Sequence, residues 1–200
     1  MVKALILVAD GSEEIEFVTI YDVLVRAGFE VVTAGVELED EKGVARLSRN
    51  LRLLPDHPTL TSVPHQTAHS NFDILLLPGG APGAKTFCTT PTVLSLISDF
   101  RRAGKWVGAI CAATTALVAS AEAHGDGKVV VTSHPSVEGV IREKGWIYSE
   151  ERVVIDSEEK LVTSRGPGTA LGWALEVVEI LGGEEKRKEV EGPMIVAEVL

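Results

Sequence analysis

The sequence predicts an α/β fold with a doubly wound, mostly parallel sheet between layers of helices, and three observations predict it. Short apolar runs of strand length at 4–9, 74–77 and 106–110 alternate with segments of helical periodicity. The connection from the first run to the next strand, at 30–35, has the length of a parallel crossover that contains a helix. No repeat, low-complexity tract or linker divides the chain, so we expect one domain spanning 1–200.

The first third of the chain predicts a strand, a helix and a second strand. The strand at 4–9 ends at Asp10-Gly11-Ser12, and apolar residues then recur at helical spacing as far as Gly28. These apolar residues include Ile15, Phe17, Val18, Tyr21 and Val25. From 36 to 72 the pattern weakens among charges and prolines, which predicts edge strands, a helical turn and loops.

The rest of the chain continues the alternation. The strand at 74–77 is apolar throughout, as in strands buried on both faces, and stops at Pro78-Gly79-Gly80. Thr90 is expected to cap a helix that starts at Pro91 and runs toward Gly104. Later elements are predicted as strands at 106–110 and 129–131, helices at 112–123, 136–144 and 169–181, and a hairpin of 153–155 with 161–163. The tail is charged at 184–191 and apolar again at 194–200, which suggests that its end packs on something.

Charge and cysteine content exclude several classes of function. The 19 basic and 29 acidic residues give a net charge of −10, so neither nucleic acid nor a membrane surface is an expected partner. Cys88 and Cys111 are the 2 cysteines and form no metal or redox pair motif, which fits a reducing compartment. We therefore expect a cytoplasmic protein, with the nucleus as a further compartment, and neither a metal nor another cofactor.

The expected chemistry lies at the carboxyl ends of the strands, where open parallel sheets bind ligands. Cys111 follows the strand at 106–110 between small residues, in the pattern of a nucleophile elbow. At the start of the next helix its thiol would have a lowered pKa. The alternative is an inert cysteine buried at the end of an apolar strand.

Three further features strengthen the catalytic interpretation. Backbone N–H groups at Gly79 and Gly80 can approach an oxyanion closely, although the same pair would also suit a simple tight turn. Glu16 lies among apolar residues of the first helix, where burial would raise the pKa of its carboxyl, although it could equally be solvated. His134 follows the strand at 129–131 and offers a second acid or base.

Together these segments resemble the ThiJ/PfpI superfamily, and within it the Parkinsonism-associated DJ-one branch. The segments are Ala9-Asp10-Gly11 with Glu13-Glu14-Ile15-Glu16, Leu77-Pro78-Gly79-Gly80, Ala109-Ile110-Cys111-Ala112, Ser133-His134-Pro135 and Thr163-Ser164-Arg165-Gly166-Pro167-Gly168-Thr169. The resemblance implies a flavodoxin-like sandwich, commonly a homodimer, with an extra C-terminal helix that would account for Met194 to Leu200. It also implies an active site of Cys111, Glu16 and His134.

Some residues depart from the patterns of related branches. Ala112 stands where the protease-like branch has histidine, which argues against a peptidase, and His134-Pro135-Ser136 lacks the carboxylate of an amidotransferase triad. Ala113 replaces a common glycine, so the elbow is expected to be more constrained. Leu54 occupies the position of a peripheral cysteine in animal members, so a redox role of that cysteine does not carry over.

The resemblance implies a glutathione-independent glyoxalase that converts methylglyoxal, a small 2-oxoaldehyde, to lactate through a cysteine hemithioacetal, with deglycase activity as an extension. Backbone N–H groups of Gly79, Gly80 and Ala112 are expected to hold the oxyanion. Arg49 and Arg165 are candidates for substrate contact, or for ordinary ion pairs at a dimer interface. The alternatives are a non-enzymatic oxidation sensor or chaperone that uses Cys111, and an amidotransferase-like hydrolase.

Overall fold

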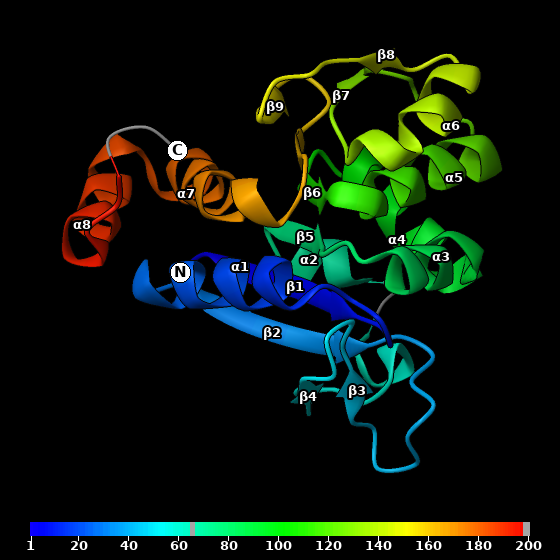
Figure 1. Ribbon diagram of the computed structural model, residues 1–200, viewed down its shortest axis with the longest axis horizontal. Helices are drawn as coiled ribbons and strands as arrows, with labels where there is room; N and C mark the ends of the chain where they lie inside the picture. The colour runs from blue at the N-terminus through cyan, green and yellow to red at the C-terminus, as the bar shows by residue number, and fades with distance from the viewer. Residues whose placement is uncertain (65–66, 198–200) are drawn as a thin grey trace.

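A six-stranded sheet forms the centre of the computed structural model, which describes residues 1–64 and 67–197 (Figure 1). The strand order is β2-β1-β5-β6-β10-β9. Its strands are β1 (Lys3–Val8), β2 (Glu30–Gly35), β5 (Ile74–Leu77), β6 (Trp106–Ile110), β10 (Leu161–Ser164) and β9 (Val153–Asp156). All neighbours pair in parallel except β9, which runs antiparallel to β10 as the predicted hairpin. The predicted doubly wound, mostly parallel α/β fold is therefore confirmed.

Helices cover both faces of this sheet. Successive residues of β1 point to opposite sides, and because both sets are apolar, each face needs a layer of helices to bury it. Leu5 and Leu7 pack with α4 (Pro91–Arg102) and α5 (Thr114–His124). Ala4, Ile6 and Val8 pack with α1 (Glu14–Arg26) and α7 (Ala170–Gly182), which contact each other. Both sets are fully buried, which explains why the strand reads as an unbroken apolar run.

Smaller elements surround the sheet. Residues 36–72 contain the antiparallel pair β3 (Ala45–Arg46) and β4 (Arg52–Leu53), a 3₁₀ turn at Leu60–Ser62 and α2 (Ala68–Asn71), as the weak pattern predicted. The strand predicted at 129–131 is β7 (Val130–Val131), which pairs with β8 (Ile147–Tyr148) outside the main sheet. The helix predicted at 136–144 is α6 (Glu138–Glu143), after a 3₁₀ turn. No helix in the described part of the chain is both long and apolar enough to span a bilayer.

The structure adds a helix, α3 (Ala81–Thr89), that the sequence did not predict. Pro82 and Gly83 lie in its first turn, and there proline is tolerated because its missing N–H would have no intrahelical partner. Thr90 does precede α4, but its hydroxyl donates to the Thr86 carbonyl of α3 and caps nothing. Cys88 therefore lies near the end of α3, shortly before the start of α4.

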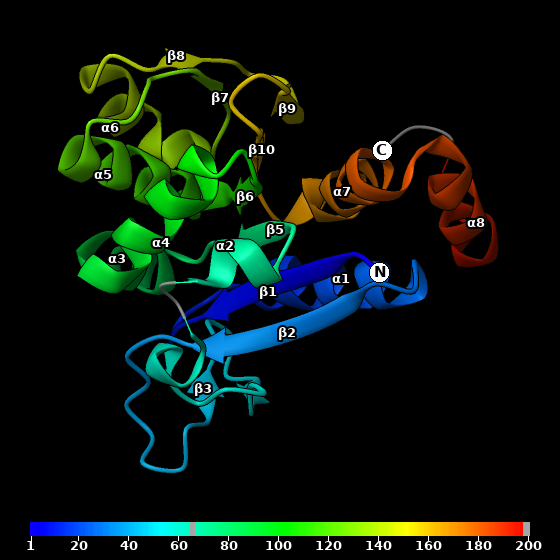
Figure 2. The ribbon, with the colours of Figure 1, turned by 180° about the vertical axis from the view of Figure 1, so that it is seen from behind.

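The C-terminal helix lies at a different place from the one expected. α8 (Glu184–Met194) is built from the charged segment, and Met194 is its last residue. Ion pairs at helical spacing stabilise it, and the Arg187 guanidinium also pairs with Glu176 and Glu179 on α7. Figure 2 shows α8 outside α7, at the end of the molecule farthest from α3. The expectation that the apolar segment after Met194 forms this helix was wrong for residues 195–197, and 198–200 lie outside the described residues.

Candidate active site

Cys111 occupies a strained elbow between β6 and α5. Its φ angle is 64°, a left-handed conformation that costs a non-glycine residue roughly 1–2 kcal/mol. The backbone turns there from the strand into a 3₁₀ turn, Cys111–Ala113, that leads into α5. Ala113 has φ −66° and ψ −17°, so alanine fits where a glycine was expected and adds no constraint.

Glu16 approaches this cysteine from α1, and its side chain is fully buried. Its Oε2 accepts a hydrogen bond of 2.7 Å from the Gly79 N–H, and its backbone N–H donates to the capping carboxylate of Glu13. Its Oε1 is buried without a hydrogen-bond partner among the described residues. Burial raises the pKa of the Glu16 carboxyl from 4.5 to about 7. The alternative of a solvated Glu16 is therefore wrong.

The face of α1 that carries Glu16 differs from the one that the apolar residues suggested. Phe17 and Ile20 are buried beside Glu16, whereas Ile15 and Val18 are 53% and 46% exposed. Tyr21 and Val25 share that outer face and are also exposed. The helix therefore has two apolar faces, and the carboxylate of Glu16 lies on the inner one.

Glycine is required at Gly79 because the cysteine and the glutamate meet there. A Cβ at Gly79 would lie 2.6 Å from Cys111 Cβ and 2.6 Å from Glu16 Oε2. Gly80 has φ 89°, and a Cβ there would lie 2.2 Å from the Gly11 carbonyl oxygen. No other residue type leaves this space, so the two glycines bring the ends of β1, β5 and β6 together.

Burial and the negative charge of Glu16 raise the pKa of the Cys111 thiol from 9.0 to about 12. The N–H groups of Ala112 and Gly80 donate to the sulfur and act in the opposite direction, but they do not compensate for the burial. The lowered pKa predicted for Cys111 was therefore wrong, because burial of the thiol and the charge of Glu16 outweigh the effect of the helix start. The two groups lie close together at Gly79, and each affects the pKa of the other, so they bind protons as a pair.

His134 lies beside the cysteine through its backbone. Its N–H donates to the Cys111 carbonyl at 3.3 Å, and its side chain is exposed. The Nδ1 atom accepts from the Ser136 N–H at 3.2 Å and lies 2.8 Å from Ser136 Oγ. The predicted second acid or base is thus close in the fold, but it lies at the surface and not in the buried site.

Arg49 and Arg165 do not join Cys111 and Glu16 in this buried site. The Arg165 guanidinium donates to the Glu150 carbonyl at 2.6 Å, and the Arg49 guanidinium donates to the Ser48 carbonyl. Within residues 1–64 and 67–197 neither arginine forms an ion pair, so this chain alone offers no support for the ion-pair alternative. Neither does it place them against a substrate.

Several residues that sequence reasoning passed over support the elbow. Buried Thr114 donates to the Thr132 carbonyl at 3.0 Å, and the Tyr148 hydroxyl donates to the Ser133 carbonyl at 2.9 Å. The first bond holds residue 132 against the start of α5, and the second holds residue 133 against β8 (Ile147–Tyr148). Hydroxyl side chains after apolar strands were the available signal, but serine and threonine are too common there for it to be specific.

Cys88 has a simpler environment. Its sulfur lies 3.2 Å from Thr115 Oγ1, and burial raises the pKa of its thiol. No carboxyl or histidine contacts it in the described part of the chain. This environment fits a structural role for Cys88.

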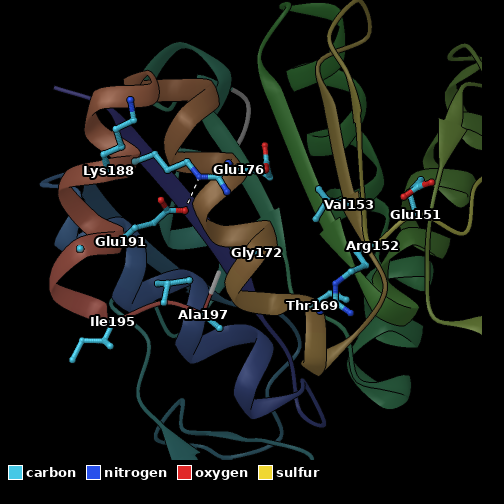
Figure 3. Close-up of a pocket in the computed structure, with 13 residues that line it drawn as sticks. Glu151, Arg152, Val153, Thr169, Gly172, Glu176, Lys188, Glu191, Ile195 and Ala197 are labelled. Atoms are coloured by element: carbon cyan, nitrogen blue, oxygen red, sulfur yellow. Dashed lines mark hydrogen bonds and ion pairs between the residues drawn. The ribbon is translucent and has the colours of Figure 1, made fainter. Parts of the chain in front are cut away.

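A cavity of about 710 Å³ lies elsewhere, along α7 between α8 and the edge strand β9 (Figure 3). Arg152 and Val153 line one side of it, and Lys188 and Glu191 line the other. Neither Cys111 nor Glu16 lines this cavity. The buried site therefore has to be identified from its chemistry and not from the size of a cavity.

Comparisons with known proteins agree with this geometry. Among curated relatives, the chain is 34% identical over 191 residues to the glutathione-independent glyoxalase DJ-1 of Schizosaccharomyces pombe, covering 95% of this chain and 96% of the relative. It is 37% identical over 196 residues to the glutathione-independent glyoxalase DJR-1.2 of Caenorhabditis elegans, covering 98% and 97%.

Solved structures give the same result. The structure of Schizosaccharomyces pombe DJ-1 matches with a TM-score of 0.89 at 32% identity, covering 98% of this chain and all of that one. The structure of Drosophila melanogaster DJ-1beta matches with a TM-score of 0.86 at 36% identity, covering 98% of each chain. The model of the DJ-1/PfpI family matches residues 2–180. The chain belongs to the DJ-1/PfpI family, as its motifs predicted.

Proposed function

We propose that this protein is a cofactor-independent glyoxalase that converts methylglyoxal to lactate. One observation carries the proposal: the buried carboxyl of Glu16, whose pKa is raised to about 7, lies beside the cysteine of a strained elbow. Such a carboxyl can both accept and return a proton near neutral pH, as a rearrangement between two carbons requires. The names of the relatives from Schizosaccharomyces pombe and Caenorhabditis elegans support the same reaction.

The first step is addition of the Cys111 sulfur to the aldehyde carbon. Since the pKa of the thiol is raised to about 12, the thiol reacts with help from a base and not as a preformed thiolate. The Glu16 carboxylate takes the thiol proton as the carbon–sulfur bond forms, and the aldehyde π electrons move to oxygen. That oxyanion accepts hydrogen bonds from the N–H groups of Gly80 and Ala112, which donate to the sulfur in the free protein. Glu16 then returns its proton to the oxyanion, which gives a hemithioacetal.

The second step moves a proton between the two carbons. The Glu16 carboxylate removes the proton of the former aldehyde carbon, the electron pair shifts to the oxygen of the neighbouring ketone, and Glu16 returns the proton to that oxygen to give an enediol. Reprotonation of the second carbon, with loss of the remaining hydroxyl proton, gives a thioester of lactate on Cys111. One carbon is oxidised and its neighbour is reduced, so the step needs no external redox partner.

Hydrolysis of the thioester completes the cycle. Water adds to the thioester carbonyl, the carbon–sulfur bond breaks, and the sulfur regains a proton to restore the thiol. His134 lies next to the elbow through its backbone bond to the Cys111 carbonyl. Its exposed ring suits the role of a base that activates this water.

Lactate formation in the absence of any added thiol tests the activity. Purified protein at neutral pH should release lactate over many turnovers, and Cys111→Ser should release none above background. Consumption of no more than one methylglyoxal per chain would contradict the proposal, because a protein that is only modified stops at that point.

A second role, oxidation sensing, is favoured by the unpartnered Oε1 of Glu16. A sulfinate on Cys111 would offer an oxygen acceptor to a protonated Glu16, together with the two N–H donors that now contact the sulfur. Mild peroxide should then modify Cys111 before Cys88 in mass spectrometry. Modification of Cys88 alone would contradict this role and leave the glyoxalase proposal intact.

We further propose that the chain is a cytoplasmic homodimer. The outer face of α1 exposes Ile15, Val18, Tyr21 and Val25, and Leu54 lies beside it with 64% of its surface exposed. An apolar stripe of this kind on a charged, acidic protein is best covered by a second copy of the same stripe. Sedimentation should show twice the 21.4 kDa chain mass, and Val18→Asp should shift the protein to the monomer. A wild-type monomer at micromolar concentration would contradict the dimer.

A further inference from the structure

A second cavity, of about 680 Å³, lies between the loop after β2 and the β3–β4 hairpin. The loop lines it with Glu37, Glu39 and Asp40, whereas the hairpin lines it with Arg46 and Arg52. One wall is therefore acidic and the other basic, and the volume suits a small metabolite. The glyoxalase mechanism uses none of these residues.

Both walls are fixed to a single carboxylate. Asp10, which follows β1, accepts the Glu39 N–H at 3.0 Å with Oδ2 and the Arg46 N–H at 2.7 Å with Oδ1. The Gly11 N–H donates to the Arg46 carbonyl at 2.8 Å, which ties the hairpin to the same point. Because the Asp10 carboxylate binds a backbone N–H of each wall, it sets the separation of the two walls at this end of the cavity.

The opposite charges of the two walls do not pair with each other. In the part of the chain that the structure describes, no ion pair involves Arg46 or Arg52. The Arg46 guanidinium donates only to Asn50 Oδ1, at 2.6 and 3.1 Å. The carboxylates of Glu37, Glu39 and Asp40 are likewise absent from the ion pairs of residues 1–64 and 67–197.

The two arginines of the basic wall also repel each other in the absence of a ligand. Arg46 and Arg52 are directly opposite each other in the antiparallel pair, so their side chains share one face. Like charges in that position repel, and a negatively charged group between them would relieve the repulsion. With Asp10 included, however, four carboxylates line the cavity against two guanidinium groups, so an anion without a positive charge would be repelled by the other wall.

We propose that this cavity binds a small zwitterion with its carboxylate between Arg46 and Arg52 and its ammonium against the acidic wall. A ligand of this class satisfies both walls at once, and arginine pairs offer the planar donors that carboxylates accept. Gly11 and Pro82 also line the cavity, and Gly11 abuts Gly80 of the active site, so the ligand would sit behind that site. The proposal does not depend on the glyoxalase activity.

Amide NMR titrations of the whole protein test the inference with a graded set of probes. Glycine, γ-aminobutyrate and ε-aminocaproate carry both charges at increasing separations, and butyrate and butylamine carry one each. At least one of the three zwitterions should shift the amides of 37–40 and 46–52, and bind at least tenfold more tightly than butyrate or butylamine. Equal binding of butyrate or of butylamine would overturn the proposal, as would the absence of shifts with all three zwitterions.

Matched variants locate the binding. Glu39→Gln and Arg52→Gln should each weaken the preferred zwitterion by about tenfold or more, since each removes one charge-assisted contact. Glu41→Gln and Lys42→Gln remove the same charges from exposed positions of the loop that do not line the cavity, and should leave the affinity unchanged. Equal weakening by all four variants would overturn the proposal.

Two further measurements on the same samples complete the test. Sedimentation confirms that each variant keeps the wild-type oligomeric state, so that a changed interface is not read as lost binding. Lactate formation from methylglyoxal should stay at the wild-type rate in Arg52→Gln. If the wild type forms no lactate, the proposed glyoxalase function is contradicted. If the wild type forms lactate but binds none of the zwitterions, only the proposed ligand site in this cavity is contradicted.

Discussion

Glu14 and Glu16 lie two residues apart on the first turn of α1, and the protein uses them in opposite ways. Glu16 points inward, is fully buried, and has a pKa raised to about 7 by that burial. Glu14 points outward and accepts hydrogen bonds from Ser48, Arg49 and Leu51, which hold the pKa of its carboxyl below the usual value. Identical side chains thus become a proton carrier and a structural acceptor because a helix turns by about 200° over two residues.

The two cysteines also differ, one in the active site and the other structural. Replacing each of them with serine tests this difference and gives the largest expected effect. Cys111→Ser should abolish lactate formation, because a serine hydroxyl is a weaker nucleophile and Glu16 is too weak a base to activate it. Cys88→Ser should keep nearly full activity, since Thr115 is the one polar partner of its sulfur among the described residues. Steady-state rates with methylglyoxal measure both. Turnover by Cys111→Ser at the wild-type rate would overturn the covalent scheme.

Glu16→Gln should lower kcat by about 10²-fold or more, as expected for loss of a general acid and base. Glutamine can still accept the Gly79 N–H bond, so the fold of the site is kept while proton transfer is lost. Glu14→Gln is the matched control and should change kcat little, because its carboxylate contacts the 48–51 segment and not the cysteine. Equal losses of kcat in the two variants would show that the buried position of Glu16 gives it no particular role in catalysis.

His134→Ala should fall between these variants, because its ring is exposed and does not belong to the buried pair. Loss of a base for thioester hydrolysis slows release of lactate more than the first addition. Mass spectrometry during turnover should therefore find a lactate adduct on Cys111 that accumulates in the variant. A slow variant without an adduct would assign His134 to an earlier step.

Much of the active site, with its inward glutamate and its elbow cysteine, could be predicted from the sequence. The strands at 74–77 and 106–110 are apolar throughout, and the segments that follow them carry Gly79, Gly80 and Cys111 at strand ends. Because parallel strands end at one edge of the sheet, their meeting follows from the fold class alone. Glu16 was found from its apolar neighbours, although those neighbours turned out to be Phe17 and Ile20 and not Ile15 and Val18.

The remaining features depend on contacts that a linear pattern does not contain. The pKa of Cys111 depends on how deeply it is buried and on the charge of Glu16, which lies 95 residues earlier in the chain. The helix α8 depends on ion pairs from Arg187 to α7, so its charged sequence did not suggest a packed element. The helix α3 was not predicted because proline and glycine, here Pro82 and Gly83, usually indicate a turn.

The two glutamates should also affect stability with opposite signs as pH changes. Glu16 titrates near 4.5 when unfolded and near 7 when folded, so between these values the folded chain binds more protons. The free energy of unfolding therefore falls as pH rises through this range, by up to about 3 kcal/mol, and Glu16→Gln should remove that slope. Glu14, with its lowered pKa, stabilises the fold above its unfolded pKa and loses that contribution as pH falls. Urea denaturation at a series of pH values measures both slopes.

The smallest expected effect concerns the hydrogen bonds of Glu14 themselves. Glu14→Gln replaces a charged acceptor of the Ser48 hydroxyl and two backbone N–H groups with a neutral one, at a cost of about 1 kcal/mol at this partly exposed position. The cost should be local: hydrogen exchange should speed up at the Arg49 and Leu51 amides. Exchange at the Gly79 amide, which Glu16 binds, should keep its rate. Faster exchange at Gly79 in this variant would mean that the outward glutamate supports the inward one, and the two sides of the helix turn would then not be independent.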